Sequence, residues 1–169
     1  MTIREMRSSD GDAVVDIYDR ALKSGHASFQ QNGGSWDDWD HGHLTKCRYV
    51  AVDEAGQVTG WAGLSAVSGR CAFAGVAEVS VYVDPQCQGR GIGSALMNAL
   101  IRGSEQNGFW SLEAGIFPEN TGSVALHRKH GFEILCQRSG FGRMGYGPMQ
   151  GQWRDVLLLE RRSNVVGID

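Results

Sequence analysis

The chain has 169 residues, of which 41% are hydrophobic and 21% charged, and its formal net charge is -3. This length is typical of one domain, here residues 1–169, that buries roughly 70% of its unfolded surface. Because the basic residues are scattered and the net charge is slightly negative, composition argues against a nucleic-acid partner or a membrane-surface partner. The N-terminus is charged and no apolar run approaches about 18 residues, so we expect a cytoplasmic protein.

Hydrophobic periodicity and turn residues divide the chain into strands and helices. Ser8 or Ser9 is expected to cap the first helix, and Gly25 to end it. A short second helix carries Trp36 and Trp39, which either line a substrate entrance or pack the helix on the sheet. In chain order we predict strand 2–6, helix 8–24, helix 36–46, a hairpin of strands 49–53 and 58–65, strand 76–83, helix 92–107, strand 110–117, helix 120–130 and strands 132–137 and 153–160.

The most informative stretch is a strand, a glycine-rich loop and a helix in direct succession. Val79, Val81 and Val83 occupy every second position, which is the pattern of a strand. The loop Gln88-Gly89-Arg90-Gly91-Ile92-Gly93 has glycine at alternate positions, so its backbone can turn tightly and aim several N–H groups into one concavity. The loop opens into the N-terminus of an amphipathic helix, and it therefore predicts a binding site for a diphosphate.

Two common glycine-rich diphosphate loops do not fit. A P-loop ends in Gly-Lys-Ser or Gly-Lys-Thr, and no lysine stands near this loop. The dinucleotide fingerprint requires a third glycine where this chain has Ser94. It also requires an acidic residue about twenty positions further on, at the end of a second strand, which this sequence lacks.

Two linked motifs carry a resemblance to a known family. The loop from Gln88 to Gly93 matches Gln/Arg-x-x-Gly-x-Gly/Ala, the pyrophosphate loop of the GCN5-related N-acetyltransferases (GNAT). The runs AEVSVYV, IFPENTGSVALHRKHGF and GQWRDVLLL look like the phosphinothricin and methionine sulfoximine acetyltransferase branch, and the similarity extends from Ile3 to about Arg161. The second motif, Asn-x-x-Ser/Ala-x-x-Leu-(Tyr or His)-x-x-x-Gly-Phe, is matched by Asn120, Ser123, Leu126, His127, Gly131 and Phe132.

The resemblance implies an α/β fold with a mixed, mostly antiparallel sheet flanked by helices. In that fold strand 76–83 splays from strand 110–117 and leaves a V-shaped cleft. The implied co-substrate is acetyl-CoA, whose pantetheine arm can pair with the free strand edge as an added strand would. The residues implied to bind it are Val81, Tyr82, Val83, Gln88, Gly89, Arg90, Gly91, Ile92, Gly93, Ser94, Asn120 and Ser123.

Transfer of an acetyl group to an amine requires a base, because the amine arrives mostly as ammonium. The resemblance implies that Glu78 is this base and acts through water, and acidic residues are depleted in strands otherwise made of valine and tyrosine. His127 stands where many relatives have tyrosine; it either protonates the leaving thiolate, assists the base, or is simply a hydrogen-bonded helix residue. A backbone N–H of a strand, at the point where strands 76–83 and 110–117 part, is expected to stabilise the oxyanion of the tetrahedral intermediate.

The resemblance also implies a small amino-acid substrate. Arg70 stands where the phosphinothricin branch presents residues to its substrate, and a guanidinium pairs bidentately with a carboxylate or phosphinate. The alternative for Arg70 is a solvated loop residue. Phe29 and Phe73 are expected to form apolar walls, with Ser80 and Glu78 completing the substrate site.

The identity of the acceptor stays open at this point. Phosphinothricin, methionine sulfoximine and arsinothricin form the leading class, but Gln30 stands where the branch commonly has glutamate. The alternatives are a polyamine, an aminoglycoside, a protein N-terminus, or a CoA-binding sensor without turnover.

Assembly and metal binding complete the expectations. The segment from Phe141 to Trp153 is too apolar for an ordinary exposed loop, and the branch is commonly dimeric, so we expect a homodimer. The four cysteines are widely spaced, without a C-x-x-C pair or a companion histidine cluster, so we expect no metal site.

Overall fold

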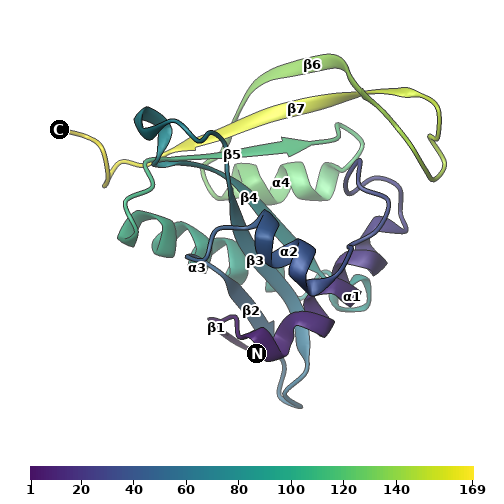
Figure 1. Ribbon diagram of the computed structural model, residues 1–169, viewed down its shortest axis with the longest axis horizontal. Coiled ribbons are helices and arrows are strands. Elements are labelled where there is room, and N and C mark those ends of the chain that lie inside the picture. Colours follow the sequence, from purple (N-terminus) through teal and green to yellow (C-terminus); the bar gives the residue numbers. More distant parts are fainter.

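A single seven-stranded sheet with helices on both faces organises the computed structural model, which describes residues 1–169 (Figure 1). The strand order is β1-β2-β3-β4-β5-β7-β6. None of the helices has the length and apolar character needed to cross a membrane. The elements are β1 (Thr2–Glu5), α1 (Gly11–Leu22), α2 (Trp36–Gly42), β2 (Tyr49–Val52), β3 (Val58–Ala66), β4 (Val76–Val83), α3 (Ile92–Gln106), β5 (Ser111–Ile116), α4 (Thr121–Lys129), β6 (Glu133–Arg143) and β7 (Trp153–Arg162), with short 3₁₀ turns at Ser8–Asp10, Cys71–Phe73 and Pro85–Cys87.

The predicted splay lies between β4 and β5. These strands form the one parallel pair in the sheet, and they are joined only at Val76↔Ser111, Ala77↔Leu112 and Glu78↔Glu113. Every other neighbouring pair is antiparallel, and β3 pairs with β4 along the whole length from Val83 to Ala77. Beyond Glu78 the β5-facing edge of β4 is therefore free, and the two strands open into a V.

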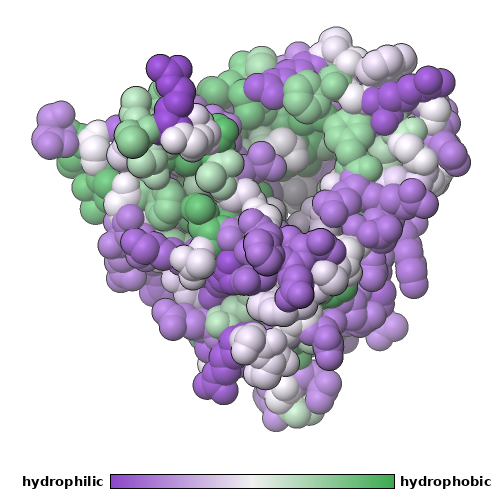
Figure 2. Space-filling model, in the orientation of Figure 1, coloured by the Kyte–Doolittle hydropathy of each residue, from purple (hydrophilic) through white to green (hydrophobic).

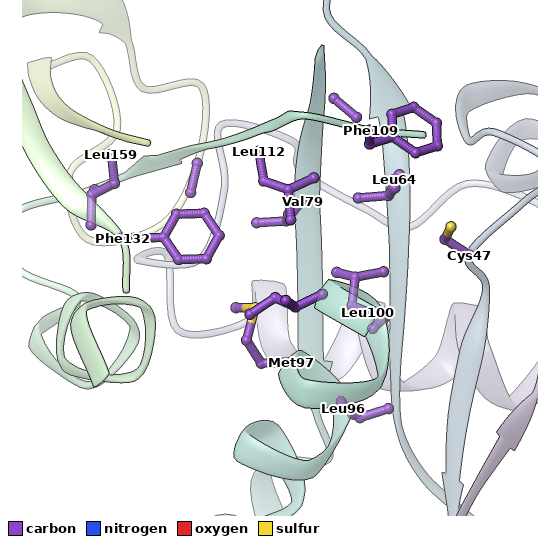
Figure 3. Close-up of a cluster of buried hydrophobic side chains, with 14 of the residues drawn as sticks. Cys47, Leu64, Val79, Leu96, Met97, Leu100, Phe109, Leu112, Phe132 and Leu159 are labelled. Atoms are coloured by element: carbon purple, nitrogen blue, oxygen red, sulfur yellow. The ribbon is translucent and has the colours of Figure 1, made fainter. Parts of the chain in front are cut away.

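Helix α3 covers one face of the sheet and holds the larger part of the core. Its apolar stripe, including Leu96, Met97 and Leu100, is fully buried against residues from the central strands. Figure 3 shows Met97 and Leu100 below Val79 and Leu112, with Leu96 further from that group along the helix. This packing fixes where the N-terminus of α3 lies, because a buried helix face cannot rotate without losing its contacts.

The opposite face is covered by α1 and α2 through aromatic side chains. Trp61 of β3 contacts Trp39 of α2 with ring centroids 5.2 Å apart and stacks with Tyr82 of β4 at 4.9 Å. Tyr18 of α1 contacts the Tyr82 ring at 4.7 Å. Both predicted entrance tryptophans take part in packing, since Trp36 stacks on Trp39 at 5.2 Å.

Three sequence predictions differ from the structure in detail. The cap before the first helix is Asp10, whose carboxylate accepts from the Arg7 N–H at 2.7 Å and is paired with Arg4, so neither Ser8 nor Ser9 serves as the cap. Helix α2 ends at Gly42, four residues before Lys46. Strand β6 continues to Arg143, well beyond the predicted end at Gln137, because its outer residues pair with β7 as far as Arg143↔Trp153.

Candidate active site

A cavity of about 1200 Å³ occupies the opening between β4 and β5. The space-filling view shows the molecule hollowed near the middle of one face (Figure 2). Arg70, Phe73 and Arg90 do not line this cavity, although the sequence predicted them as site residues. The predicted residues that line it together are Phe29, Glu78, Ser80, Val81, Tyr82, Val83, Gln88, Gly89, Gly91, Ile92, Gly93, Ser94, Asn120, Ser123 and His127.

The glycine-rich loop forms one end of the cavity and offers an array of free donors. None of the backbone N–H groups from Gln88 to Ser94 donates a hydrogen bond within the chain. Gly91 stands at the N-cap of α3 with φ of 79°, a conformation that favours glycine, and a Cβ built there meets nothing within 4 Å. Free N–H groups at a helix N-terminus suit an anionic diphosphate, so the loop fits the group that the sequence predicts.

The loop is held in place at both of its ends. Asp84, before the loop, accepts from the Gln86 N–H at 3.0 Å and is paired with Arg20 of α1 at 2.8 Å. After the loop, the Ser94 hydroxyl lies 2.7 Å from Nε2 of His130 at the end of α4. A donor array anchored in this way is arranged before any ligand binds, which reduces the entropy lost on binding.

The free edge of β4 forms the wall next to the loop. The main-chain groups of β4 that face β5 have no strand partner after the Glu78↔Glu113 pair. Val81 and Val83 stand on this edge, and both line the cavity. An extended chain with amide groups can pair with such an edge, as the pantetheine arm does in the sequence prediction.

Glu78 lies at the vertex of the V, opposite Glu113. The Glu78 side chain is open to the cavity, but surrounding protein atoms partly exclude water from its carboxyl group. This desolvation, together with the charge of Glu113, raises the pKa of Glu78, while the charge of Arg138 acts in the other direction. A raised pKa brings a carboxylate closer to the range in which it accepts protons efficiently at neutral pH. Glu78 forms no ion pair with any side chain of the protein.

His127 is buried on α4, and its ring is held on one side. Nδ1 lies 2.7 Å from the Ser123 carbonyl oxygen, and the ring meets Phe132 edge-on with centroids 5.0 Å apart. Burial lowers the pKa of His127, which favours the neutral imidazole. In that form Nδ1–H donates to the carbonyl and Nε2 is the free acceptor.

Comparison with known proteins decides the family. The model of the acetyltransferase (GNAT) family matches residues 12–132. The chain belongs to the GNAT family. A Bacillus subtilis (strain 168) protein with the provisional name phosphinothricin acetyltransferase YwnH is 39% identical over 95% of this chain and 98% of its own. A Pseudomonas aeruginosa L-methionine sulfoximine/L-methionine sulfone acetyltransferase is 30% identical, with 94% of this chain and 92% of its own covered.

A solved structure agrees with this assignment. The GNAT phosphinothricin acetyltransferase of Sinorhizobium meliloti, determined with acetyl-CoA, superposes with a TM-score of 0.86 at 28% identity, covering 99% of this chain and 91% of its own. The predicted fold is therefore confirmed, and the protein is a GNAT N-acetyltransferase that uses acetyl-CoA. When acetyl-CoA is bound, it supplies the acetyl group as an activated thioester.

The GNAT cavity has a second wall formed by residues 26–29, of which the sequence predicted only Phe29. Arg154 of β7 is fully buried beneath this segment; it donates to the Gly25 carbonyl oxygen at 2.6 Å and lies over the Phe117 ring at 3.6 Å. Tyr146 donates to the Ser28 carbonyl oxygen at 2.9 Å, and Phe29 packs against Phe117. This side of the cavity is thus a preformed wall.

Glu113 and Arg138 are two charged residues of the cavity lining that sequence reasoning missed. Glu113 stands in the otherwise apolar strand SLEAGI, so the argument that singled out Glu78, an acidic residue inside a strand, applies to it equally. Arg138 is exposed on β6 and stacks over Phe141 at 4.9 Å without a carboxylate partner. No short-range motif contains Arg138, because its place in the cavity depends on the pairing of β6 with β7.

Proposed function

We propose that this enzyme acetylates the α-amino group of a small glutamate-like amino acid such as phosphinothricin, methionine sulfoximine or arsinothricin. The observation that carries the proposal is that Glu78 and an unpaired cation, Arg138, line the same cavity at the point where β4 and β5 part. A carboxylate for an ammonium group and a guanidinium for an acidic group match the two ends of an amino acid. The names of the relatives support the same substrate class.

In the proposed reaction Glu78 takes a proton from the acceptor's ammonium group, directly or through water, and frees the nitrogen lone pair. The nitrogen forms a bond to the acetyl carbon, and the bond from that carbon to sulfur then breaks. CoA leaves as a thiolate and takes up, through water, the second proton that the nitrogen loses as the amide forms. A free backbone N–H of β4 beyond Glu78 donates to the acetyl oxygen as negative charge develops there. Because its pKa is raised, Glu78 suits proton uptake near neutral pH.

His127 takes a supporting part in this proposal. Its lowered pKa favours the neutral ring, whose Nε2 accepts a proton, over the imidazolium that would donate one. Of the two chemical roles predicted from the sequence, assistance to the base therefore fits better than protonation of the thiolate.

Arg138 and Arg70 are the two candidates for the acidic group of the substrate. Arg138 lines the cavity, whereas Arg70 is exposed outside it and lies over Phe73 at 5.4 Å. We assign the acidic group to Arg138 and keep Arg70, with Phe73 beside it, as the alternative. The kinetics of Arg138→Ala and Arg70→Ala decide between them. Loss of the arginine that binds the acidic group raises the acceptor KM by roughly 10-fold or more, whereas loss of the other arginine leaves the KM unchanged.

A screen tests the function itself. The purified chain is incubated with acetyl-CoA and, separately, with phosphinothricin, methionine sulfoximine, arsinothricin, spermidine, an aminoglycoside and a peptide with a free N-terminus. Thiol release gives the rate, and mass spectrometry identifies the N-acetylated product. We expect turnover with the amino-acid analogues; turnover confined to the other amines, or none at all, would contradict the proposal.

The homodimer belongs to the same proposal, along with a cytoplasmic location. The segment from Phe141 to Trp153 uses part of its apolar surface within the chain, since Met144 is buried and Tyr146 contacts Ser28. What remains exposed on β6 and β7 includes Leu135, Phe141 and Trp153, with Trp153 66% exposed. β6 is an edge strand, and exposed apolar residues on an edge favour a partner. A monomer mass by light scattering at micromolar concentration would exclude the dimer.

A further inference from the structure

A row of glutamates crosses the sheet at the vertex of the cavity. Glu78 of β4 stands opposite Glu113 of β5, and Glu113 stands opposite Glu160 of β7. Directly opposed residues of neighbouring strands point to the same face of a sheet. Glu78 and Glu113 both line the cavity, whereas Glu160, next in the row, does not.

The sheet gains no stability from this arrangement. Opposed side chains of neighbouring strands lie on one face within reach of each other, and like charges placed directly opposite are destabilising. Neither Glu78 nor Glu113 makes an ion pair, so no cation of the chain compensates the pair directly. When two strands otherwise follow the ordinary rules of strand pairing, opposed like charges that no cation neutralises are characteristic of functional sites.

Binding of an ammonium group in the cavity accounts for the two carboxylates. The proposed acceptor brings an ammonium group, a compact cation with three donors, to Glu78. One carboxylate can take the proton while the other holds the remaining N–H donors and the positive charge. Glu113 is half-buried and faces the same space, so it can accept such a contact.

We propose that Glu113 is a positioning residue for the acceptor amine, which together with Glu78 brackets the ammonium group where β4 and β5 part. This inference rests on the proposed function and deepens it, because it makes a primary ammonium group the feature that the vertex recognises. Glu113 acts through the position of the amine and through its charge on Glu78, and it takes no proton itself.

Because Glu113 carries a charge, the proposal also predicts a change in the pH dependence of kcat/KM. The groups whose charges act on Glu78 are Glu113 from β5 and Arg138 from β6; on β3 the opposite residue is the uncharged Ser65, and Tyr82 is the titratable neighbour on the same face of β4. Glu113 raises the pKa of Glu78, and Arg138 lowers it. Removing the charge of Glu113 therefore lowers the pKa of Glu78 and moves the acidic limb of the kcat/KM profile to lower pH.

The test compares Glu113→Gln with Glu113→Asp and with Glu160→Gln, which removes a charge from the same row outside the cavity. With methionine sulfoximine as the probe, we expect Glu113→Gln to raise the acceptor KM by about 10-fold, as the loss of a charge-assisted contact should. We also expect its acidic limb to shift to lower pH, and the acetyl-CoA Kd to stay unchanged. Glu113→Asp keeps the limb near its wild-type position, and Glu160→Gln matches wild type in every measurement. An unmoved limb in Glu113→Gln, or an equal shift in Glu160→Gln, overturns the proposal.

A second measurement separates this inference from the proposed function. Carbon-13 NMR of glutamate side-chain carboxyls follows the titration of Glu78 in the protein without substrate, with the Glu78→Gln variant identifying the signal. If no amine is turned over, the proposed function fails, yet a lower Glu78 midpoint in Glu113→Gln still establishes the coupling between the two residues. An unchanged midpoint refutes that coupling. Circular dichroism of each variant verifies its fold.

Discussion

The Ser94 hydroxyl at the start of α3 lies 2.7 Å from Nε2 of His130 at the end of α4. This contact joins the two sequence motifs, because Ser94 directly follows the glycine-rich loop and His130 follows α4, the helix of the second motif. The glycine-rich loop is thus fixed by a residue that is remote in sequence.

His130→Ala removes this support, and we expect it to weaken acetyl-CoA binding by about 2- to 10-fold, the range of one net hydrogen bond. The maximal rate at saturating acetyl-CoA stays near that of wild type, because His130 is not placed at the reacting groups. Isothermal titration calorimetry measures the affinity. His41→Ala, at an exposed histidine on α2, serves as the control, and a His130→Ala protein with wild-type affinity would show that the contact is incidental.

Gly91→Ala tests the loop without relying on a bulky side chain. Gly91 and Gly56 have φ values of 79° and 82°, and a Cβ at either position meets no protein atom within 4 Å. Both alanine variants should lose about 1 kcal/mol of unfolding free energy through the left-handed conformation alone. Only Gly91→Ala should also weaken acetyl-CoA binding, by roughly 10-fold or more, because its methyl group stands where the diphosphate must approach. Equal affinities of the two variants would remove Gly91 from the binding site.

Arg154 tests the buried support of the cavity wall formed by residues 26–29. Arg154→Met removes a fully buried guanidinium that holds the Gly25 carbonyl and covers Phe117, and it should cost about 3 kcal/mol of unfolding free energy. Its partner Glu119 has a side chain 49% exposed, so Glu119→Gln should cost less than about 1 kcal/mol. Urea denaturation measures both. A loss in Glu119→Gln as large as that in Arg154→Met would mean that the ion pair, rather than the buried contacts, provides the stability.

The pH dependence of stability tests the neutral state of His127. Burial lowers its pKa below the ordinary value of 6.5, so as pH falls through that value the unfolded chain binds a proton that the folded chain does not. Stability should therefore decline between about pH 7 and pH 5, and His127→Asn should flatten the decline. His41→Asn, at an exposed histidine, should not. Denaturation midpoints at several pH values provide the measurement, and a wild-type slope in His127→Asn would contradict the assignment.

Local patterns predicted the elements that carry the cofactor motifs. The range of β4 agrees at both ends, α3 differs by one residue, and Asn120 caps α4 by accepting from the Ser123 N–H, because strand alternation, glycines and caps act over a few residues. The length of β6 was not predictable in this way. Its exposed residues have no period of their own, and pairing with β7 alone extends it to Arg143.

The same distinction between local and long-range pairing separates the site residues that were predicted from those that were not. The residues of the loop and of β4 follow one another in sequence, so the motif predicted them together. Arg138 and Glu113 reach the cavity, and Arg154 reaches the Gly25 carbonyl behind the cavity wall, only through the order of strands β5, β7 and β6. Arg70 shows the converse, since a residue near Glu78 in sequence lies outside the cavity.

The most direct test of the central claim is the rate of acetyl-CoA consumption by Glu78→Gln, measured beside wild type with the preferred amino-acid acceptor at neutral pH. Glutamine keeps the shape of the side chain but cannot take the amine proton. We predict that kcat falls by roughly 100-fold or more, the usual scale for loss of a general base, while the acetyl-CoA Kd measured on the same samples stays the same. Equal rates in the two proteins would contradict the account and remove Glu78 from the mechanism.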